Sequence, residues 1–240
     1  MLMTLDYPEV KTLDFTNDLY SGLSDIKNYY QKHIYVSENT ILTQSSLSKY
    51  KDDIYGDPDM KKTTDYQKII DISYNILNDN GFKVTKEEWF LELHKYHITE
   101  DMYKNIDKTQ FMREKQNNNG KNLYQFDKEL DNFILESSEI AGKKYKRYTD
   151  FEWHLDDGAN KFDCHTIIYF LRKTPINNVG GNFFWKSSDN SDEINKIKVK
   201  DNIIVLMRGD VWHSPGWITT NEKQVIERES IVVQLKKHKL

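Results

Sequence analysis

The chain has 240 residues and a formal net charge of -4, from 34 basic and 38 acidic residues, so no overall basic field indicates nucleic acid. Its longest apolar runs are too short to span a membrane, and its first residues do not resemble a secretory signal. The single cysteine, Cys164, excludes an internal disulfide framework and is typical of a reducing compartment. We therefore expect a cytoplasmic protein, or one of the host cytoplasm or virion if its Asn- and Lys-rich composition reflects an AT-rich viral genome.

The first part of the chain, residues 1–142, is predicted to be a mainly helical support region. Helices are expected over residues 14–31, 64–77 and 125–140, because apolar side chains recur there at the spacing of one helix face. The Asn, Asp and Gly residues at 78–81 form a typical carboxyl-terminal stop for the second helix.

Two histidines, His94 and His97, lie in the apolar segment 87–97, where the pattern does not separate strand from helix. Their spacing would place both on one face of a helix, as a metal-binding pair requires. No third ligand is apparent beside them, so we expect packing or surface roles for both.

The second part of the chain, residues 143–240, is predicted to consist of short strands. Residues 165–171, 182–185, 203–207 and 226–235 are rich in β-branched and aromatic side chains and are separated by Gly, Asn and Asp turns. Strands at this spacing predict a β-sandwich or barrel. Because no linker or repeat separates the two parts, we expect one integrated α+β domain in which the first region packs on the second.

A candidate metal site lies in the predicted strands. His154 and Asp156 are separated by one residue, so on a strand both side chains point to the same face. His213, in a turn-flanked segment, is the best candidate for a third ligand from another strand. Two imidazoles and one carboxylate leave open positions on an iron, whereas a structural zinc site is closed by four ligands. Taken separately, the first two residues also fit a surface pair, and His213 fits a core histidine.

A candidate anion site follows in the last strand, where Arg228 and Ser230 share one face. A guanidinium binds a carboxylate through two hydrogen bonds, and a neighbouring hydroxyl adds another. A cation that points inward from an apolar strand is costly without an anionic partner. Because Glu227 and Glu229 lie on the opposite strand face, a bound dicarboxylate is favoured over a structural ion pair.

With these residues in this order, the chain resembles the 2-oxoglutarate/Fe(II)-dependent oxygenases, and among them the prolyl-4-hydroxylase-like group. The family signature is an HxD pair, a distal His and an Arg or Lys. In this chain the basic residue is an Arg followed two positions later by a Ser, the R-x-S form. The apolar strand 166–171, the Gly-Gly segment 180–184 and Tyr145 ahead of the HxD pair also resemble family elements. The resemblance covers about residues 143–236 and implies a double-stranded β-helix, a jelly-roll or cupin-like barrel.

The resemblance implies an activity, hydroxylation of a substrate C–H bond with release of succinate and CO2. The implied cofactors and cosubstrates are Fe(II), 2-oxoglutarate and O2, with ascorbate as a further requirement of some activities. The implied metal ligands and catalytic residues are His154, Asp156 and His213. The implied contacts of 2-oxoglutarate are Arg228, Ser230, Tyr145 and Thr166.

Three residues are candidates for the family tyrosine that contacts the cosubstrate. The usual Gly-Gln turn after Tyr145 is absent, which leaves Tyr148 as an alternative. A third candidate, Tyr169, lies in the apolar strand. Other side chains are expected to be structural: Asp157 in a turn or in solvent, His165 in packing, and Trp185 and Trp212 in the core.

Three substrate classes remain open under the same chemistry. The local resemblance favours a peptidyl prolyl or lysyl side chain, so that the partner is a protein or peptide. A small metabolite is the second class, and a nucleobase, which the charge balance does not favour, is the third. A non-enzymatic cupin-like binding module is the alternative outside catalysis, and the complete triad and Arg228 count against it.

Overall fold

The computed structural model describes the chain in segments. These are residues 9–15, 33–37, 40–98, 125–127, 132–134, 136–140, 143–147, 153–157, 162–174, 179–188, 191–216, 218–219 and 226–238. No helix among them is long and apolar enough to cross a membrane.

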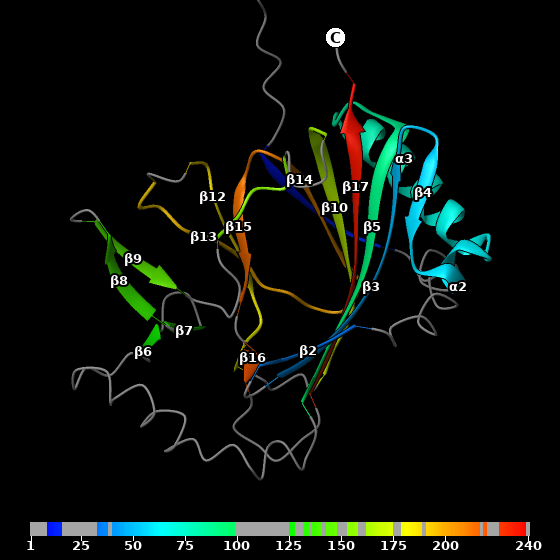
Figure 1. Ribbon diagram of the computed structural model, residues 1–240. Helices are drawn as coiled ribbons and strands as arrows, with labels where there is room; N and C mark the ends of the chain where they lie inside the picture. The colour runs from blue at the N-terminus through cyan, green and yellow to red at the C-terminus, as the bar shows by residue number, and fades with distance from the viewer. Residues whose placement is uncertain are drawn as a thin grey trace, which may run out of the picture.

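The main feature is an eight-stranded antiparallel sheet, with strand order β1-β14-β10-β17-β5-β3-β2 and β4 paired to β3 (Figure 1). Three strands from the second part of the chain, β14, β10 and β17, lie between β1 and β5 of the first part. The bounds are β1 Val10–Asp14, β2 His33–Ser37, β3 Thr40–Tyr50, β4 Asp53–Gly56, β5 Val84–Ile98, β10 Cys164–Thr174, β14 Ile203–Arg208 and β17 Ile226–Lys237.

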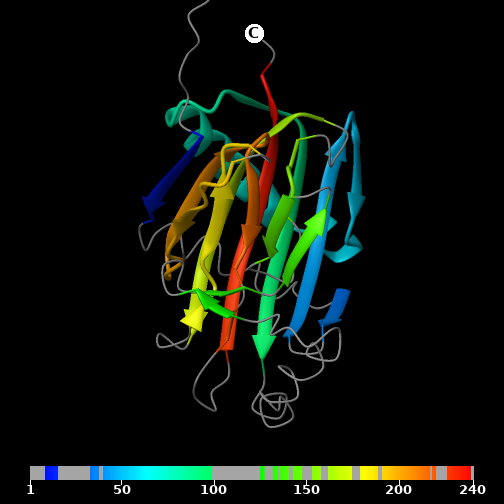
Figure 2. The same cartoon turned by 90° about the vertical axis from the view of Figure 1, so that its left-hand side faces the viewer.

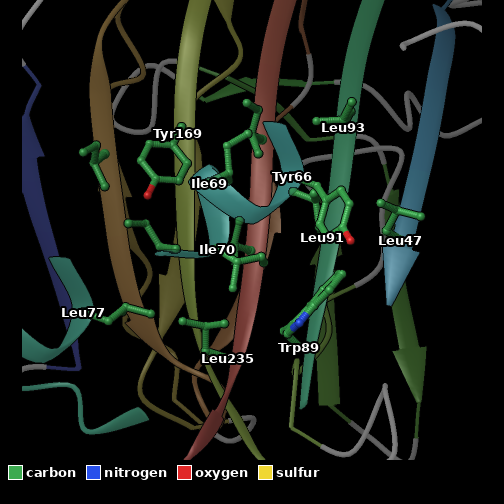
Figure 3. Packing of buried hydrophobic residues seen from close by; sticks show 14 of the residues in the cluster. Leu47, Tyr66, Ile69, Ile70, Leu77, Trp89, Leu91, Leu93, Tyr169 and Leu235 are labelled. Atoms are coloured by element: carbon green, nitrogen blue, oxygen red, sulfur yellow. The ribbon is translucent and has the colours of Figure 1, made fainter. Parts of the chain in front are cut away.

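One face of this sheet is covered by helix α3 (Asp65–Asp79), which follows the short helix α2 (Pro58–Lys61). The buried stripe of α3 includes Tyr66, Ile69 and Leu77, at the spacing of one helix face. These side chains pack with Tyr169 of β10 and Leu235 of β17 in one apolar cluster (Figure 3). The helix predicted over residues 64–77 is therefore confirmed, and the predicted stop follows it, where Gly81 adopts a φ of 95°.

The other face is covered by a three-stranded sheet of order β13-β12-β15 (Figures 1 and 2). Its strands are β12 Phe183–Lys186, β13 Asn195–Ile197 and β15 Trp212–Pro215. Phe183 of β12 and Ile197 of β13 pack against Ile168 of β10 and Val205 of β14. This second apolar cluster holds the two sheets together, and the candidate site lies between them.

Three two-stranded pairings complete the described strands. They are β11 (Val179–Gly180) with β16 (Ile218–Thr219), β6 (Gln125–Asp127) with β7 (Asn132–Ile134), and β8 (Glu136–Ile140) with β9 (Lys143–Arg147). The four strands predicted in the second part of the chain are confirmed as β10, β12, β14 and β17.

Two predictions for the first part of the chain need correction. The helix predicted over residues 125–140 is wrong, because β6, β7 and β8 occupy this range. Helical spacing in a short apolar stretch is weak evidence, and pairing between strands overrides it here. A mainly helical region is not confirmed either, because β3 and β5 are the longest elements described there besides α3. The helix predicted over residues 14–31 falls largely outside the described residues.

The predicted double-stranded barrel is confirmed only as a mostly antiparallel architecture. The described strands form two facing sheets of unequal size, and a closed barrel is not confirmed. The segment 87–97, left undecided by its pattern, is part of the long strand β5. This strand lies next to β17, so the first part of the chain reaches the candidate site directly.

Candidate active site

The three candidate metal ligands come together at one point between the sheets. The backbones of His154 and His213 form an isolated antiparallel bridge, with both N–H···O distances at 3.1 Å. Asp156 Oδ1 lies 4.0 Å from His154 Nε2 and 3.7 Å from His213 Nε2. One ligand atom from each residue lies within 4.8 Å of the other two, which suits a single metal ion. The strand geometry expected for the HxD pair and the distal His thus brings all three side chains together.

Neighbouring groups fix the orientation of two of these ligands. Thr166 donates its hydroxyl hydrogen to Asp156 Oδ2 over 2.5 Å, which leaves Oδ1 for a metal. His213 Nδ1 lies 3.0 Å from the carbonyl oxygen of Val211, so a proton on Nδ1 leaves Nε2 free to coordinate. Phe183 stacks on the His213 ring at 5.5 Å between centroids.

The electrostatic environment favours a neutral imidazole at His213. Burial lowers the pKa of His213, and the nearby His154 lowers it further, while the Asp156 carboxylate raises it. A metal binds the neutral form of histidine, so a lowered pKa keeps this ligand available. Exposure differs within the triad, because the His154 side chain is 46% exposed whereas that of Asp156 is 7% exposed. The metal site therefore opens to solvent on the His154 side.

The residue after the triad carboxylate, Asp157, anchors this segment to the large sheet. Its carboxylate accepts hydrogen bonds from the Cys164 backbone N–H at 2.8 Å and from the Lys237 ammonium at 2.5 Å. The carbonyl of Gly209 accepts from the backbone N–H groups of both Asp156 and Asp157. A Cβ atom at Gly209 would lie only 2.4 Å from the backbone carbonyl oxygen of Cys164 and 2.3 Å from Asp157 Oδ1, so this close approach requires glycine. Asp157 is thus a structural residue, in the turn position expected for it.

The triad lies on a cavity of about 200 Å³ between the two sheets. Its walls are largely apolar, with a small number of polar groups that face the same space, as is usual for a small-molecule site. The lining residues are Glu92, His94, His154, Asp156, Ile168, Phe170, Phe183, His213, Pro215, Arg228, Ser230, Val232 and Gln234.

Arg228 lies deep in this cavity and is only 2% exposed. Its Nη1 donates to the carbonyl oxygen of Gly181 at 3.2 Å, and its guanidinium carbon lies 5.9 Å from the ring centroid of Phe170. Ser230, on the same face of β17, is 3% exposed and lines the same cavity. Glu229 is oriented toward Lys95, at 3.5 Å, and is absent from the cavity lining. The deep part of the cavity therefore carries a buried cation with a hydroxyl beside it.

The remaining predicted contacts of a cosubstrate have different places. Thr166 lies against Asp156, and its predicted contact with 2-oxoglutarate stays a prediction. Tyr169 lies on the helix-covered face of the sheet, where its hydroxyl is 2.8 Å from that of Ser73 and burial raises its pKa. It therefore does not reach the cavity. The side chain of Tyr145 and all of Tyr148 lie outside the described residues.

Two cavity residues, Glu92 and His94, were missed by the sequence reasoning. His94 Nε2 lies 2.7 Å from Glu92 Oε2, and both residues come from β5. The pair was overlooked because the segment was judged for a helical pairing of His94 with His97. Strand alternation carries the correct signal, since Leu91 and Leu93 face the helix-covered cluster while the residues between and after them face the cavity.

The other residues expected to be structural are absent from the cavity lining. Trp185 packs at the edge of the second apolar cluster. Trp212 and Trp153 flank the ammonium of Lys186, at 5.8 and 5.1 Å from the ring centroids. His165 packs edge-on against Phe82, on the helix-covered side.

Comparison with known proteins gives similarity at the level of structure only. No family model matches the chain, and no curated protein does. Similar solved structures include IDO from Bacillus thuringiensis, with 13% identity and a TM-score of 0.49 over 95% of this chain and 93% of that chain. A 2OG-Fe(II) oxygenase family oxidoreductase from Burkholderia pseudomallei has 11% identity and a TM-score of 0.48, over 96% and 85% of the two chains. A prolyl hydroxylase from Trichoplax adhaerens, in complex with a hypoxia inducible factor peptide fragment, has 10% identity and a TM-score of 0.49, over 97% and 86%.

Proposed function

We propose that the protein is an Fe(II)- and 2-oxoglutarate-dependent oxygenase that hydroxylates a substrate C–H bond. The observation that carries this proposal is a single cavity lined by both the His154, Asp156 and His213 cluster and the buried Arg228. A metal site alone fits many activities. The combination with a buried cation in the same cavity supports a metal-bound ligand that also carries a free carboxylate.

The donor set fits Fe(II). Two imidazole nitrogens and one carboxylate oxygen are the ligands of the facial triad in non-haem iron oxygenases. Three protein ligands leave coordination positions for a chelating cosubstrate and O2, whereas a structural zinc site would need a fourth protein ligand. In the described part of the chain, His154, Asp156 and His213 are the only such group of His, Cys, Asp or Glu side chains, which supports an open site.

The deep part of the cavity fits a carboxylate. Arg228 presents a planar set of N–H donors that matches a carboxylate, and Ser230 supplies a hydroxyl on the same face. Because Arg228 is only 2% exposed, binding of an anion by its guanidinium is strongly favourable. We assign Arg228 and Ser230 to the far carboxylate of 2-oxoglutarate, with Tyr145 and Thr166 as further predicted contacts.

The residues of the chain bind, orient and exclude water. When bound, Fe(II) and 2-oxoglutarate supply an oxidation in which O2 and the cosubstrate give succinate, CO2 and one oxygen atom for the substrate hydroxyl. Thr166 and the Val211 carbonyl hold Asp156 and His213 in their metal-binding orientations. The apolar side chains of Phe170 and Phe183 keep water from the space between the metal end and Arg228.

The same proposal includes a more specific enzyme group, compartment and substrate class. The resemblance over residues 143–236 supports a prolyl-4-hydroxylase-like enzyme with a double-stranded β-helix core, acting in the cytoplasm on a peptidyl prolyl or lysyl side chain. A small metabolite or a nucleobase would use the same chemistry. Ascorbate, as a reductant that keeps the iron ferrous, is a testable addition to the assay.

The test is the anaerobic addition of Fe(II) and 2-oxoglutarate, which we expect to produce a weak visible charge-transfer band. His154→Ala removes a metal ligand, so it should abolish the band and weaken Fe(II) binding by more than the roughly 100-fold that loss of an outer contact can cost. The matched control is His238→Ala, because His238 is an exposed histidine outside the cavity. A wild-type protein that gives neither the band nor substrate-linked succinate would contradict the proposal.

A further inference from the structure

The Glu92–His94 pair is a second polar group in the cavity, distinct from the triad and from Arg228. Both residues project from β5 into the cavity, and their side chains are 15% and 18% exposed. Arg228, at 2%, is much less exposed. The pair is therefore closer to solvent than Arg228 is.

Strand register places Glu92 toward the metal end of the cavity. Glu92 lies opposite Val232 of β17, and the next cavity-facing residue of that strand, Gln234, lies opposite Thr166. Thr166 in turn holds the metal ligand Asp156. Arg228 is four residues from Val232, a separation of about 13 Å along an extended strand. The acid of the pair and the deep cation thus occupy different levels of the cavity.

The imidazole of His94 lies beside one of the two oxygens of the Glu92 carboxylate, with Nε2 2.7 Å from Oε2. His94 Nε2 lies against Oε2, whereas an ionised carboxylate accepts at both oxygens. Apart from the triad, Arg228 and this pair, the cavity-lining residues are uncharged, with apolar side chains such as Ile168, Phe183 and Pro215. A carboxylate in such surroundings repels a second anion and attracts a cation.

These observations divide the cavity into an anion-binding part and a cation-binding part. The far carboxylate of the dicarboxylate belongs with Arg228, which lies four residues along β17 from the partner of Glu92. A substrate whose reacting C–H bond lies beside the metal is then within reach of Glu92, and a protonated amine is the substrate group that a carboxylate binds best there.

We propose that Glu92, which lies beside His94, binds the protonated aliphatic amine of the primary substrate. This inference rests on the proposed oxygenase function and narrows its substrate class to amines. The amine can belong to a free small molecule, such as an amino acid or a polyamine, or to a lysyl side chain of a peptide. A peptidyl prolyl side chain, which has no such group, does not fit.

The experiment measures succinate formed from 2-oxoglutarate by the full chain with Fe(II) and O2. The probes are the twenty protein amino acids, putrescine and a lysine-containing peptide, each beside its N-acetylated counterpart. We expect at least one amine to stimulate succinate release tenfold or more, and its acetylated form to lose this effect. Stimulation by free amines or by the peptide distinguishes the two sources.

Variants test the role of Glu92 itself. Glu92→Gln keeps the size of the side chain and removes its charge, so we expect the KM for the active amine to rise at least tenfold while the anaerobic Fe(II)–2-oxoglutarate band stays unchanged. The matched control is Glu87→Gln, because Glu87 lies on the same strand, is 71% exposed and contacts Lys236 outside the cavity.

The outcomes separate the two levels of the proposal. An intact band with no amine-stimulated succinate overturns the amine assignment and leaves the oxygenase proposal standing. Equal activity of acetylated and free amines, or equal kinetics of Glu92→Gln and Glu87→Gln, overturns it as well. A wild-type protein without the band overturns the proposed function, and the amine assignment falls with it.

Discussion

The two faces of strands β10 and β17 have opposite characters although their residues alternate along the same two segments of the sequence. One face packs against α3 and is almost entirely apolar, and the other lines the cavity and mixes apolar with polar and charged groups. The helix-covered face presents Ile167, Tyr169, Leu171, Ile231, Val233 and Leu235. The cavity face presents Ile168, Phe170, Arg228, Ser230, Val232 and Gln234.

This difference teaches how one sheet supports both stability and chemistry. Side chains alternate between faces with a period of two, so neighbouring residues can serve separate purposes. Burial of apolar area against α3 stabilises the fold by about 25 cal/mol per Å². The opposite face holds a buried cation. This cation lowers the stability of the protein when the cavity is empty, but it provides binding energy for an anion. Substitutions on the two faces should therefore change different measured quantities.

The largest expected effect separates ligand binding from folding at Arg228. Arg228→Met should raise the Kd for 2-oxoglutarate about thirtyfold or more, because removing one member of a buried charge pair costs about 2–5 kcal/mol. Fe(II) affinity should stay nearly unchanged, since the triad is intact. The unfolding free energy should change little or increase, because an apolar residue replaces a buried ion. Titration of the anaerobic band and urea unfolding measure the three quantities.

The control for this variant is its neighbour on the other face, Glu229→Gln. Glu229 faces Lys95 and lies outside the cavity lining, so its loss of charge should leave 2-oxoglutarate binding unchanged. Equal loss of metal and 2-oxoglutarate binding in Arg228→Met would instead make Arg228 a structural residue.

Sequence reasoning was sufficient where a short motif and a strand period coincide. His154 and Asp156 were placed on one face by their spacing alone, and His213 was the best candidate for a third ligand from another strand. Arg228 was identified by the physical cost of a cation in an apolar strand. The strands β10, β14 and β17 were predicted because they contain continuous β-branched and aromatic runs.

Sequence reasoning failed where the partners of a segment decide its structure. Residues 125–140 have helical apolar spacing, yet they form short strands that pair within the segment and with β9. Glu92 and His94 are recognised as cavity residues only from the register of β5 against β17, which joins residues far apart in the chain. Local pattern contains no information about such a pairing, so the contribution of the first part of the chain to the cavity could not be predicted.

The next effect concerns His165, a ring on the helix-covered side whose pKa is strongly lowered. Burial lowers the pKa of His165 to about 4, and its Nδ1 has no hydrogen-bond partner among the described residues. Because the unfolded chain takes up this proton near pH 6.5 and the folded chain does not, stability is complete above pH 6.5 and falls as the pH drops toward 4. The loss between pH 7 and 4.5 should be about 2.5 kcal/mol.

His165→Leu should remove this part of the acid sensitivity, and urea unfolding of both proteins at pH 7 and 4.5 measures it. Carboxylates titrate equally in the two proteins, so only the difference between them reports on His165. An identical pH dependence in wild type and variant would show that the ring is not protected from protonation by the fold.

The smallest expected effect compares two adjacent valines that point to opposite faces of β17. Val233 is fully buried in the helix-covered cluster, whereas Val232 is only partly buried beside the cavity. Val233→Ala should lower the unfolding free energy by about 2 kcal/mol, from lost transfer energy and an unfilled cavity, and Val232→Ala by about 1 kcal/mol or less.

Urea unfolding measures the free energies, and the anaerobic band measures 2-oxoglutarate affinity. The affinity should change in Val232→Ala and not in Val233→Ala, because only the first side chain lines the cavity. If both variants lost stability and affinity to the same extent, the two faces would be energetically coupled, and the separation of folding from binding along this strand would not hold.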